Sequence, residues 1–267
     1  MSLVAVAQFV PSDDCAGNLA AITGLAESAV ERGATLVVFP EYSSYFTPAM
    51  GQGWLDAAEP IDGSFVSGLA ALAVRLKIHV VAGFIERTPD ATRVSNTLVA
   101  LAPSGHVEAE YRKLHLYDAF GQRESDWVLA GPIEEPRLFA WEGFTVGLQT
   151  CYDIRFPEVT RRLVDAGADL VLVPAEWVRG PLKEQHWRTL VTARAIENTV
   201  YFAAADHGPP IGVGNSMIVD PMGVELATIG EEASAVAVAE LSQARISAVR
   251  ATNPALALRR FGVVPRA

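Results

Sequence analysis

The sequence predicts a protein of the α/β class. Short apolar runs typical of buried strands alternate with stretches whose apolar residues have helical spacing. The predicted helices lie between predicted strands in both halves of the chain, and the apolar runs are numerous enough for two sheets. No Pro/Gly/Ser-rich linker and no internal repeat interrupt this pattern, so we expect residues 1–267 to form one domain. The pattern does not give the order of the strands.

In the first half, two segments have the periodicity of helices. Residues 18–32 place Leu19, Ile22 and Leu25 on one helical face, and Gly33 follows as a C-terminal cap. Residues 64–75 show a similar spacing. The predicted strands are the apolar runs at 3–9, 36–39, 79–85, 95–101 and 107–111.

Residues 112–136 are polar and irregular, so they predict a long loop of the kind that is usually functional inside a compact domain. Helices are expected over 157–166 and 184–199, and from an N-cap at Ser242 to Arg250. Residues 253–267 are expected to form an irregular C-terminal tail. The predicted strands of this half are 144–150, 170–173, 200–205, 215–219, 224–229 and 235–241.

Composition excludes several classes of function. The net charge is −10 and no Lys/Arg-rich run is present, which argues against a nucleic-acid or anionic-membrane partner. No stretch approaches the ~20 apolar residues of a membrane span, and the N-terminus lacks the features of a signal peptide. We therefore expect a cytoplasmic protein whose two cysteines are free thiols. The histidines are scattered and no metal-binding motif is present, so neither a metal nor a cofactor is expected.

Polar residues follow three predicted strands at the positions where α/β proteins place their sites. Cys151 ends one strand shortly before a helix that begins at Pro157, a setting that lowers a thiol pKa and supplies an oxyanion hole. Glu41 suits a general base and Lys113 an electrostatic clamp. Taken singly, each has a plainer reading as a packing cysteine, a loop acid or a solvated lysine. Cys15 follows two aspartates that raise a thiol pKa and reduce its reactivity.

The residues around these three positions resemble one family. FPEY around Glu41, YRKLHLYD around Lys113 and CYDIRFPE around Cys151 are similar to motifs of the nitrilase superfamily of carbon–nitrogen hydrolases, and they occur in the family's order. The resemblance covers nearly the whole chain. It implies a four-layer α-β-β-α sandwich that assembles as a homodimer or a larger homo-oligomer, with Glu41, Lys113 and Cys151 as the catalytic trio.

The same resemblance implies further site residues and a mechanism. Glu124 is expected as a fourth catalytic residue that positions Lys113 or the substrate amide. Glu41 would deprotonate Cys151, which would attack a small carboxamide and form a thioester that water then hydrolyses. The expected oxyanion donors are Lys113 and the backbone N–H of Tyr152. The substrate contacts implied by the resemblance are Tyr42, Tyr152, Arg155, Glu176 and Trp177.

The substrate class remains open between alternatives. Tyr152-Asp153 after the cysteine is typical of the amidase branch, where nitrile-converting members tend to have Trp-Glu, and the surrounding motifs resemble the omega-amidase and deaminated-glutathione-amidase group. That group implies a short omega-amide bearing a carboxylate, for which Arg155, Arg179 and Lys183 are candidate partners. The alternatives are hydrolysis of nitriles or N-carbamoyl amines, and a non-catalytic binding or assembly protein on the same fold.

Overall fold

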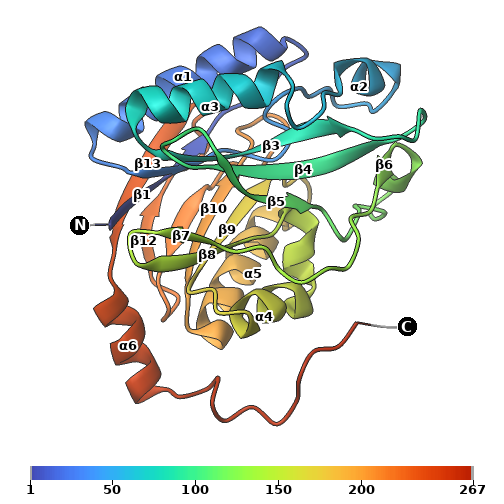
Figure 1. Cartoon of the computed structure of the whole chain (residues 1–267). Coiled ribbons are helices and arrows are strands. Elements are labelled where there is room, and N and C mark those ends of the chain that lie inside the picture. Colours follow the sequence, from blue (N-terminus) through green and yellow to red (C-terminus); the bar gives the residue numbers. More distant parts are fainter. Residues whose placement is uncertain (1, 266–267) are drawn as a thin grey trace.

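The computed structural model describes residues 2–265 and contains two β-sheets that pack face to face (Figure 1). The first sheet has seven strands in the order β13-β1-β2-β3-β4-β5, and β6 pairs with β4. Its strands are β1 (Ser2–Gln8), β2 (Leu36–Val38), β3 (His79–Arg87), β4 (Val94–Leu101), β5 (Val107–Arg112), β6 (Val128–Leu129) and β13 (Ala235–Leu241).

The second sheet has six strands in the order β12-β11-β10-β9-β8-β7. In each sheet three central strands are parallel, β1 to β3 in the first and β8 to β10 in the second. The strands of the second sheet are β7 (Phe139–Trp141), β8 (Phe144–Leu148), β9 (Leu170–Ala175), β10 (Tyr201–Asp206), β11 (Met217–Val219) and β12 (Glu225–Thr228).

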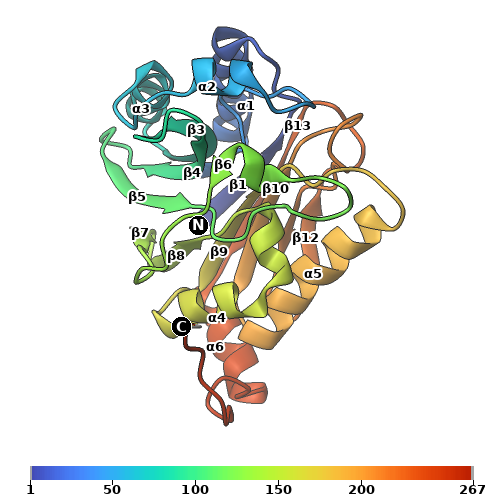
Figure 2. The ribbon, with the colours of Figure 1, turned by 90° about the vertical axis from the view of Figure 1, so that its right-hand side faces the viewer.

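Helices cover the outer face of each sheet. Helices α1 (Cys15–Glu31) and α3 (Ser64–Leu76) lie on the first sheet, and α4 (Pro157–Asp165) and α5 (Lys183–Asn198) lie on the second (Figures 1 and 2). Helices α2 (Gln52–Ala57) and α6 (Gln243–Thr252) lie at the margins (Figure 1), and the chain also forms two 3₁₀ turns, η1 (Glu124–Asp126) and η2 (Cys151–Arg155). The four-layer α-β-β-α sandwich expected from the resemblance is confirmed.

The layered packing explains why central strands such as β1, β2 and β9 are apolar along most of their length. In β1, Val4 and Val6 point into the core between the two sheets, whereas Ala5 and Ala7 pack with residues of α1 and α3. Because successive side chains point to opposite faces, a strand covered on both sides needs apolar residues at every position. A third apolar core lies between the second sheet and helices α4 and α5.

The predicted elements agree with the structure apart from local differences. Helix α1 begins at Cys15, earlier than predicted, because the Asp14 carboxylate accepts a hydrogen bond from the Gly17 N–H and caps the helix. The region 112–136 contains η1 and β6 as well as loop. Helix α2 and strand β7 were not predicted, because both are too short to show a periodicity. Among residues 2–265, no helix combines the length and apolar character that a membrane crossing requires.

Candidate active site

Four of the predicted side chains meet at one end of the sandwich. The Lys113 ammonium lies 2.9 Å from Glu41 Oε1 and 2.9 Å from Glu124 Oε2, and the exposed fraction of each of these residues is 5% or less. Cys151 is 5% exposed and lines the same cavity. The structure thus brings together residues that are distant in sequence and that come from both sheets.

Glu41 follows β2 and is held by hydrogen bonds from three directions. Its Oε1 accepts from Asn96 Nδ2 at 2.6 Å, and its Oε2 accepts from the Glu176 N–H at 2.6 Å. His207 Nε2 lies 2.7 Å from the Glu41 carbonyl oxygen and donates to it. Gly83 on β3 allows that strand to pack closely against the backbone of Glu41, because a Cβ at position 83 would lie 2.8 Å from Glu41 Cα. The carboxylate is therefore fixed by backbone and side-chain contacts from both sheets.

Lys113 is anchored through its backbone as well as its ammonium. Its N–H donates to the Asn96 carbonyl at 2.9 Å, and its carbonyl accepts from the Gly131 N–H at 2.8 Å. Glu124 lies on η1 and accepts a 2.5 Å hydrogen bond from the Tyr42 hydroxyl. The prediction that Glu124 positions Lys113 agrees with this geometry, and Tyr42 is placed to hold Glu124.

Cys151 begins η2 and has a φ of +43°, a left-handed conformation that is rare for a residue with a side chain. A buried carboxylate two residues later stabilises this turn. Asp153 accepts hydrogen bonds from the Tyr111 hydroxyl at 2.7 Å, the His115 N–H at 2.9 Å and the Thr150 N–H at 3.2 Å. The thiol therefore lies at a fixed position, with Sγ 3.5 Å from the carbonyl oxygen of Glu176.

The electrostatics of the site correct one expectation. Burial, followed by the charge of Glu41, raises the pKa of the Cys151 thiol well above its usual value, so the prediction that the strand–turn–helix setting lowers it is wrong. The helix dipole is outweighed because the thiol is buried beside a carboxylate. Burial also raises the pKa of Glu41. Burial acts in the same direction on Glu124, but the charge of Lys113 and the hydrogen bonds from Lys113, Tyr42 and Tyr117 together hold the Glu124 pKa below its usual value.

These shifts assign different protonation behaviour to the two glutamates. Burial alone would lower the pKa of Lys113, but the Glu124 and Glu41 carboxylates raise it well above its usual value. Lys113 is thus a permanent cation paired with Glu124, whereas Glu41 has a pKa moved toward the range in which a general base works. The raised pKa of the thiol favours its neutral form in the resting site.

Cys15 differs from Cys151 in its surroundings. It is the first residue of α1, is partly exposed and is not among the residues that line the cavity of Cys151. Burial, then Glu59, then Asp14 and Asp13 raise its pKa. The predicted effect of the two aspartates is therefore present, although it is smaller than the effect of burial.

A cavity of about 760 Å³ opens onto the four catalytic candidates. Tyr42, Tyr152, Glu176 and Trp177 line it, as expected for substrate contacts. Arg155 does not line it. Its guanidinium carbon instead lies 4.9 Å from the Trp177 ring centroid and 5.8 Å from that of Tyr152, so Arg155 packs behind the aromatic wall.

Lys183 is one of the cations that line the cavity. It is buried, and its ammonium donates a 2.6 Å hydrogen bond to the Tyr117 hydroxyl and lies 4.2 Å from the Phe120 ring centroid. Within residues 2–265, no carboxylate lies within ion-pair distance of this ammonium. Arg179 also lines the cavity, but it lies 3.0 Å from Glu231.

Several residues of the site were not predicted. Asn96 bonds both glutamates, Tyr117 donates its N–H to Glu124, and Asp153 and His207 hold the turns behind them. The available signal for Asn96 was its place in a polar run, Ser95–Thr97, at the start of a strand that is apolar afterwards, because buried polar residues need a partner. No sequence pattern indicated which partner that would be.

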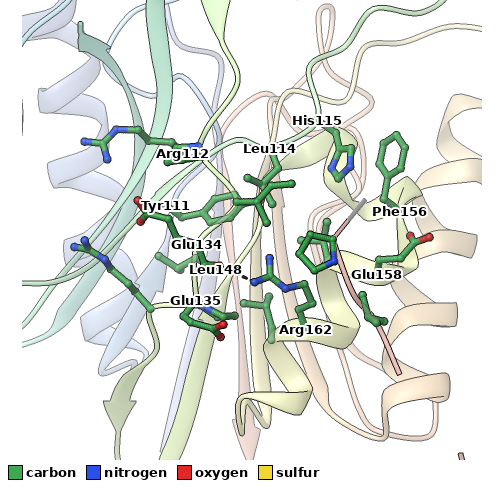
Figure 3. A pocket seen from close by; sticks show the side chains of 18 of the residues that line it. Tyr111, Arg112, Leu114, His115, Glu134, Glu135, Leu148, Phe156, Glu158 and Arg162 are labelled. Carbon is green, nitrogen blue, oxygen red and sulfur yellow. Dashed lines mark hydrogen bonds between the residues drawn. The ribbon is translucent and has the colours of Figure 1, made fainter. Parts of the chain in front are cut away.

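A second cavity, of about 450 Å³, lies on the other side of the η2 turn. It is lined by the end of β5, residues 132–137, α4 and tail residues 263–265, and it contains none of the four catalytic candidates. Figure 3 shows Tyr111 and His115 there, the two residues that hold Asp153 from behind. This cavity therefore borders the support of Cys151 and not its reactive face.

Among residues 2–265, no group of three or more His, Cys, Asp or Glu side chains is arranged to hold a metal ion. In the catalytic trio, the group beside Glu41 is the Lys113 ammonium, whereas a metalloenzyme would need a further metal ligand there. Independence from metals and cofactors stays a prediction, which dialysis against a chelator can test.

Comparison with known proteins agrees with this geometry. The model of the carbon–nitrogen hydrolase family matches residues 3–251, which leaves the tail outside the match. A deaminated glutathione amidase of Escherichia coli O157:H7 is 40% identical over 265 residues, covering 97% of each chain. A deaminated glutathione amidase of Rattus norvegicus is 35% identical over 247 residues, which cover 86% of this chain and 74% of the relative.

Solved structures of similar fold include two informative cases. The Caenorhabditis elegans NitFhit protein superimposes with a TM-score of 0.88 at 30% identity, over 97% of this chain and 65% of its own. The amidase of Nesterenkonia sp. AN1 gives a TM-score of 0.82 at 28% identity over 97% of each chain. A variant of that amidase with glutamine in place of a glutamate carries the acetamide moiety of fluoroacetamide on its active-site cysteine. Fold, site geometry and sequence together show that the chain belongs to the carbon–nitrogen hydrolase family, within the nitrilase superfamily.

Proposed function

We propose that this enzyme hydrolyses a small carboxamide to a carboxylate and ammonia through a thioester on Cys151. The convergence of Glu41, Lys113 and Cys151 at one buried point is the observation that carries this proposal. The names of the relatives, two of them deaminated glutathione amidases, support an amide in preference to a nitrile.

In the proposed reaction, Glu41 acts first as a base and then as an acid, while Lys113 and Tyr152 stabilise the oxyanion. Glu41 accepts the Cys151 proton as the thiolate attacks the amide carbon, and the charge on the carbonyl oxygen is held by Lys113 and the Tyr152 N–H. Each such donor is worth about 3 kcal/mol of transition-state stabilisation. The C–N bond then breaks as Glu41 returns the proton to the leaving nitrogen, which departs as ammonia. Water gives a proton to Glu41, attacks the thioester and releases the acid, and the thiol regains its proton.

We further propose that the substrate is a short omega-amide whose far end is a carboxylate bound by Lys183. This ammonium is buried in the cavity wall without an ion-pair partner among the described residues. Burial and the positive charge of Arg155 lower its pKa. A bound anion would offset both effects, since an opposite charge stabilises the ammonium. Arg155 adds to the positive potential from behind the aromatic wall, in place of the direct contact expected for it.

The test compares kcat/KM for monoamides of short dicarboxylic acids with that for neutral amides of equal length. We expect the carboxylated amide to be preferred, and Lys183→Met to reduce its kcat/KM by about 10- to 100-fold while changing the neutral amide little, because a charge-assisted contact is lost. The preference should weaken at high salt, because the interaction is between charges. Nitriles of equal length should react slowly.

Cys151→Ala serves as the control for any background release of ammonia. An acyl adduct on the peptide containing Cys151, seen by mass spectrometry after acid quench, identifies the nucleophile. A neutral amide that equals its carboxylated analogue would contradict the Lys183 assignment, whereas full activity in Cys151→Ala would refute the amidase mechanism itself.

A further inference from the structure

Glu176 has a side chain that the proposed mechanism does not use. Its backbone serves the triad, since its N–H donates to Glu41 at 2.6 Å and its carbonyl lies 3.5 Å from the Cys151 sulfur. Glu176 lines the same cavity of about 760 Å³. Within residues 2–265, its buried Oε1 has no hydrogen-bond partner, and no cation lies within ion-pair distance of its carboxyl group. The carboxyl group of Glu176 is therefore available to form a hydrogen bond with a ligand in the cavity.

The groups that face Glu176 decide its protonation state. Burial, followed by the charge of Glu41, raises the pKa of Glu176 well above its usual value. Glu124 on η1 acts in the same direction, while Lys113 and Lys183 oppose it.

The ammonium groups of Lys113 and Lys183 already donate hydrogen bonds to other residues. Lys113 bonds both catalytic glutamates, and the ammonium of Lys183 donates to Tyr117. Asp206 on β10 and Cys151 on η2 do not stabilise a Glu176 carboxylate, because neither a carboxyl group nor a thiol can carry a positive charge. The raised pKa favours the protonated form of Glu176, and a carboxylic acid of this kind offers an O–H donor and an acceptor oxygen.

We propose that Glu176 is a specificity-determining residue that donates its carboxylic acid O–H to an oxygen on the substrate carbon next to the scissile amide. This inference rests on the proposed amidase function and adds a substituent to the substrate class. The fixed backbone supports the position, because the amide N–H and carbonyl of Glu176 hold the base and the nucleophile. A side chain that starts between these two groups reaches the substrate beside its acyl carbon, not at its far end.

A hydroxyl oxygen at that carbon matches both capacities of the acid, since it accepts the O–H of Glu176 and donates to Oε1. A substrate that lacks it leaves a buried polar group unpaired, which enzymes use to discriminate between close analogues. The favoured substrates are therefore 2-hydroxy amides, numbered from the amide carbon.

The experiment measures kcat/KM for two monoamides of a four-carbon dicarboxylic acid, one with and one without a hydroxyl on the carbon next to the amide. Wild type should prefer the hydroxylated amide by about 10-fold or more at neutral pH. Glu176→Leu, which keeps the volume but removes both hydrogen-bonding capacities, should reduce the ratio to about one. Glu176→Gln retains a donor and an acceptor and should keep most of the preference.

The pH dependence separates this role from a purely structural one. As the pH rises through the pKa of Glu176, the O–H donor is lost, so the preference of wild type should decline on the alkaline side. The Glu176→Gln variant has no titrating group there and should keep its ratio constant. Circular dichroism of each variant checks that the fold is intact.

Several outcomes would overturn the proposal. A wild-type ratio near one, or a ratio that persists in Glu176→Leu, would do so while amide hydrolysis stands. Preference for the 2-amino analogue in wild type, lost in Glu176→Gln, would mean that the group acts as a carboxylate binding an ammonium. Failure of wild type to hydrolyse either amide, or any other in the panel, refutes the amidase function and this inference with it.

Discussion

At the scale of single residues, Glu41 and Cys151 form a pair in which the charge of the Glu41 carboxylate raises the cost of ionising the thiol. Burial contributes most to the raised pKa of both groups, and the carboxylate adds to that of the thiol. Such a site keeps the thiol protonated until a substrate carbonyl arrives, because transfer of the proton to Glu41 becomes favourable only as the sulfur attacks. The apparent pKa values seen in kinetics would belong to the pair.

The pair predicts opposite effects of Glu41→Gln on two reactions. Amide hydrolysis should fall by about 10²- to 10⁴-fold, because the general base is gone. Alkylation of Cys151 by iodoacetamide should continue, with its pH midpoint shifted to lower pH, because removing a negative charge beside the thiol lowers its pKa. Stopped alkylation followed by peptide mass spectrometry at a series of pH values gives both the rate and the modified residue.

Peptide mapping also reports Cys15, which serves as the internal reference with an unchanged pH midpoint. An upward shift of the Cys151 midpoint in Glu41→Gln, or no shift, would show that the carboxylate does not depress thiolate formation. In the Nesterenkonia amidase, a glutamate-to-glutamine variant still carries the acetamide moiety of fluoroacetamide on its active-site cysteine.

At the scale of elements, the site is built from the ends of strands. Glu41 follows β2, Cys151 follows β8, Glu176 follows β9 and His207 follows β10. Parallel strands bring their carboxyl ends to one edge of a sheet, and the face-to-face packing of two such sheets brings both edges together. An isolated bridge between Phe9 and His207 joins the two sheets at this end.

The packing of β3 against the Glu41 turn requires a glycine at position 83, and this requirement can be tested. A Cβ there would lie 2.7 Å from the Tyr42 nitrogen and 2.8 Å from Glu41 Cα, and neither backbone atom can move without shifting the Glu41 turn. We expect Gly83→Ala to lower the free energy of unfolding by about 1–3 kcal/mol, as overpacking does, and to lower kcat. Urea unfolding and steady-state kinetics measure the two effects.

Gly24→Ala is the matched control. Gly24 lies in the interior of α1 and a Cβ there would meet no atom within 4 Å, so alanine should be neutral or stabilise the helix by up to about 1 kcal/mol. If Gly83→Ala behaves like Gly24→Ala, the close approach of β3 to the Glu41 turn is not needed for stability or activity.

At the scale of the whole molecule, the tail exposes large apolar side chains. Leu258, Phe261 and Val264 are 70%, 91% and 82% exposed. The single domain and the homodimer expected from the sequence stay predictions. The exposed apolar side chains of the tail suggest where the contact between subunits can be tested. Apolar groups gathered in one segment are more typical of an interface than of a free surface.

We therefore expect sedimentation velocity to show a dimer or larger homo-oligomer, and truncation after Thr252 to weaken the association. Phe261→Glu should have the same effect in the full chain, because it places a charge where an apolar contact is expected. Truncation leaves the stretch matched by the family model complete, so circular dichroism should be unchanged. A wild-type monomer at micromolar concentration would contradict the expectation.

Much of the fold and of the site was predictable from local patterns. Apolar periodicity gave the α/β class and most strand and helix positions, and three motifs identified Glu41, Lys113 and Cys151. These features are predictable because they depend on residues close together in the chain. Strand order could not be predicted this way, because strands that pair, such as β1 and β13, are far apart in sequence.

The tertiary structure alone decided which groups serve the site and with what charge. It placed Asn96 between the two glutamates, put Lys183 in the cavity wall and moved Arg155 behind the aromatic rings. It also reversed the expected direction of the Cys151 pKa, because burial and the proximity of Glu41 are properties of the folded chain. The sequence by itself determined which reactive groups are present and the layered fold that holds them, and the fold determined their distances, exposure and protonation.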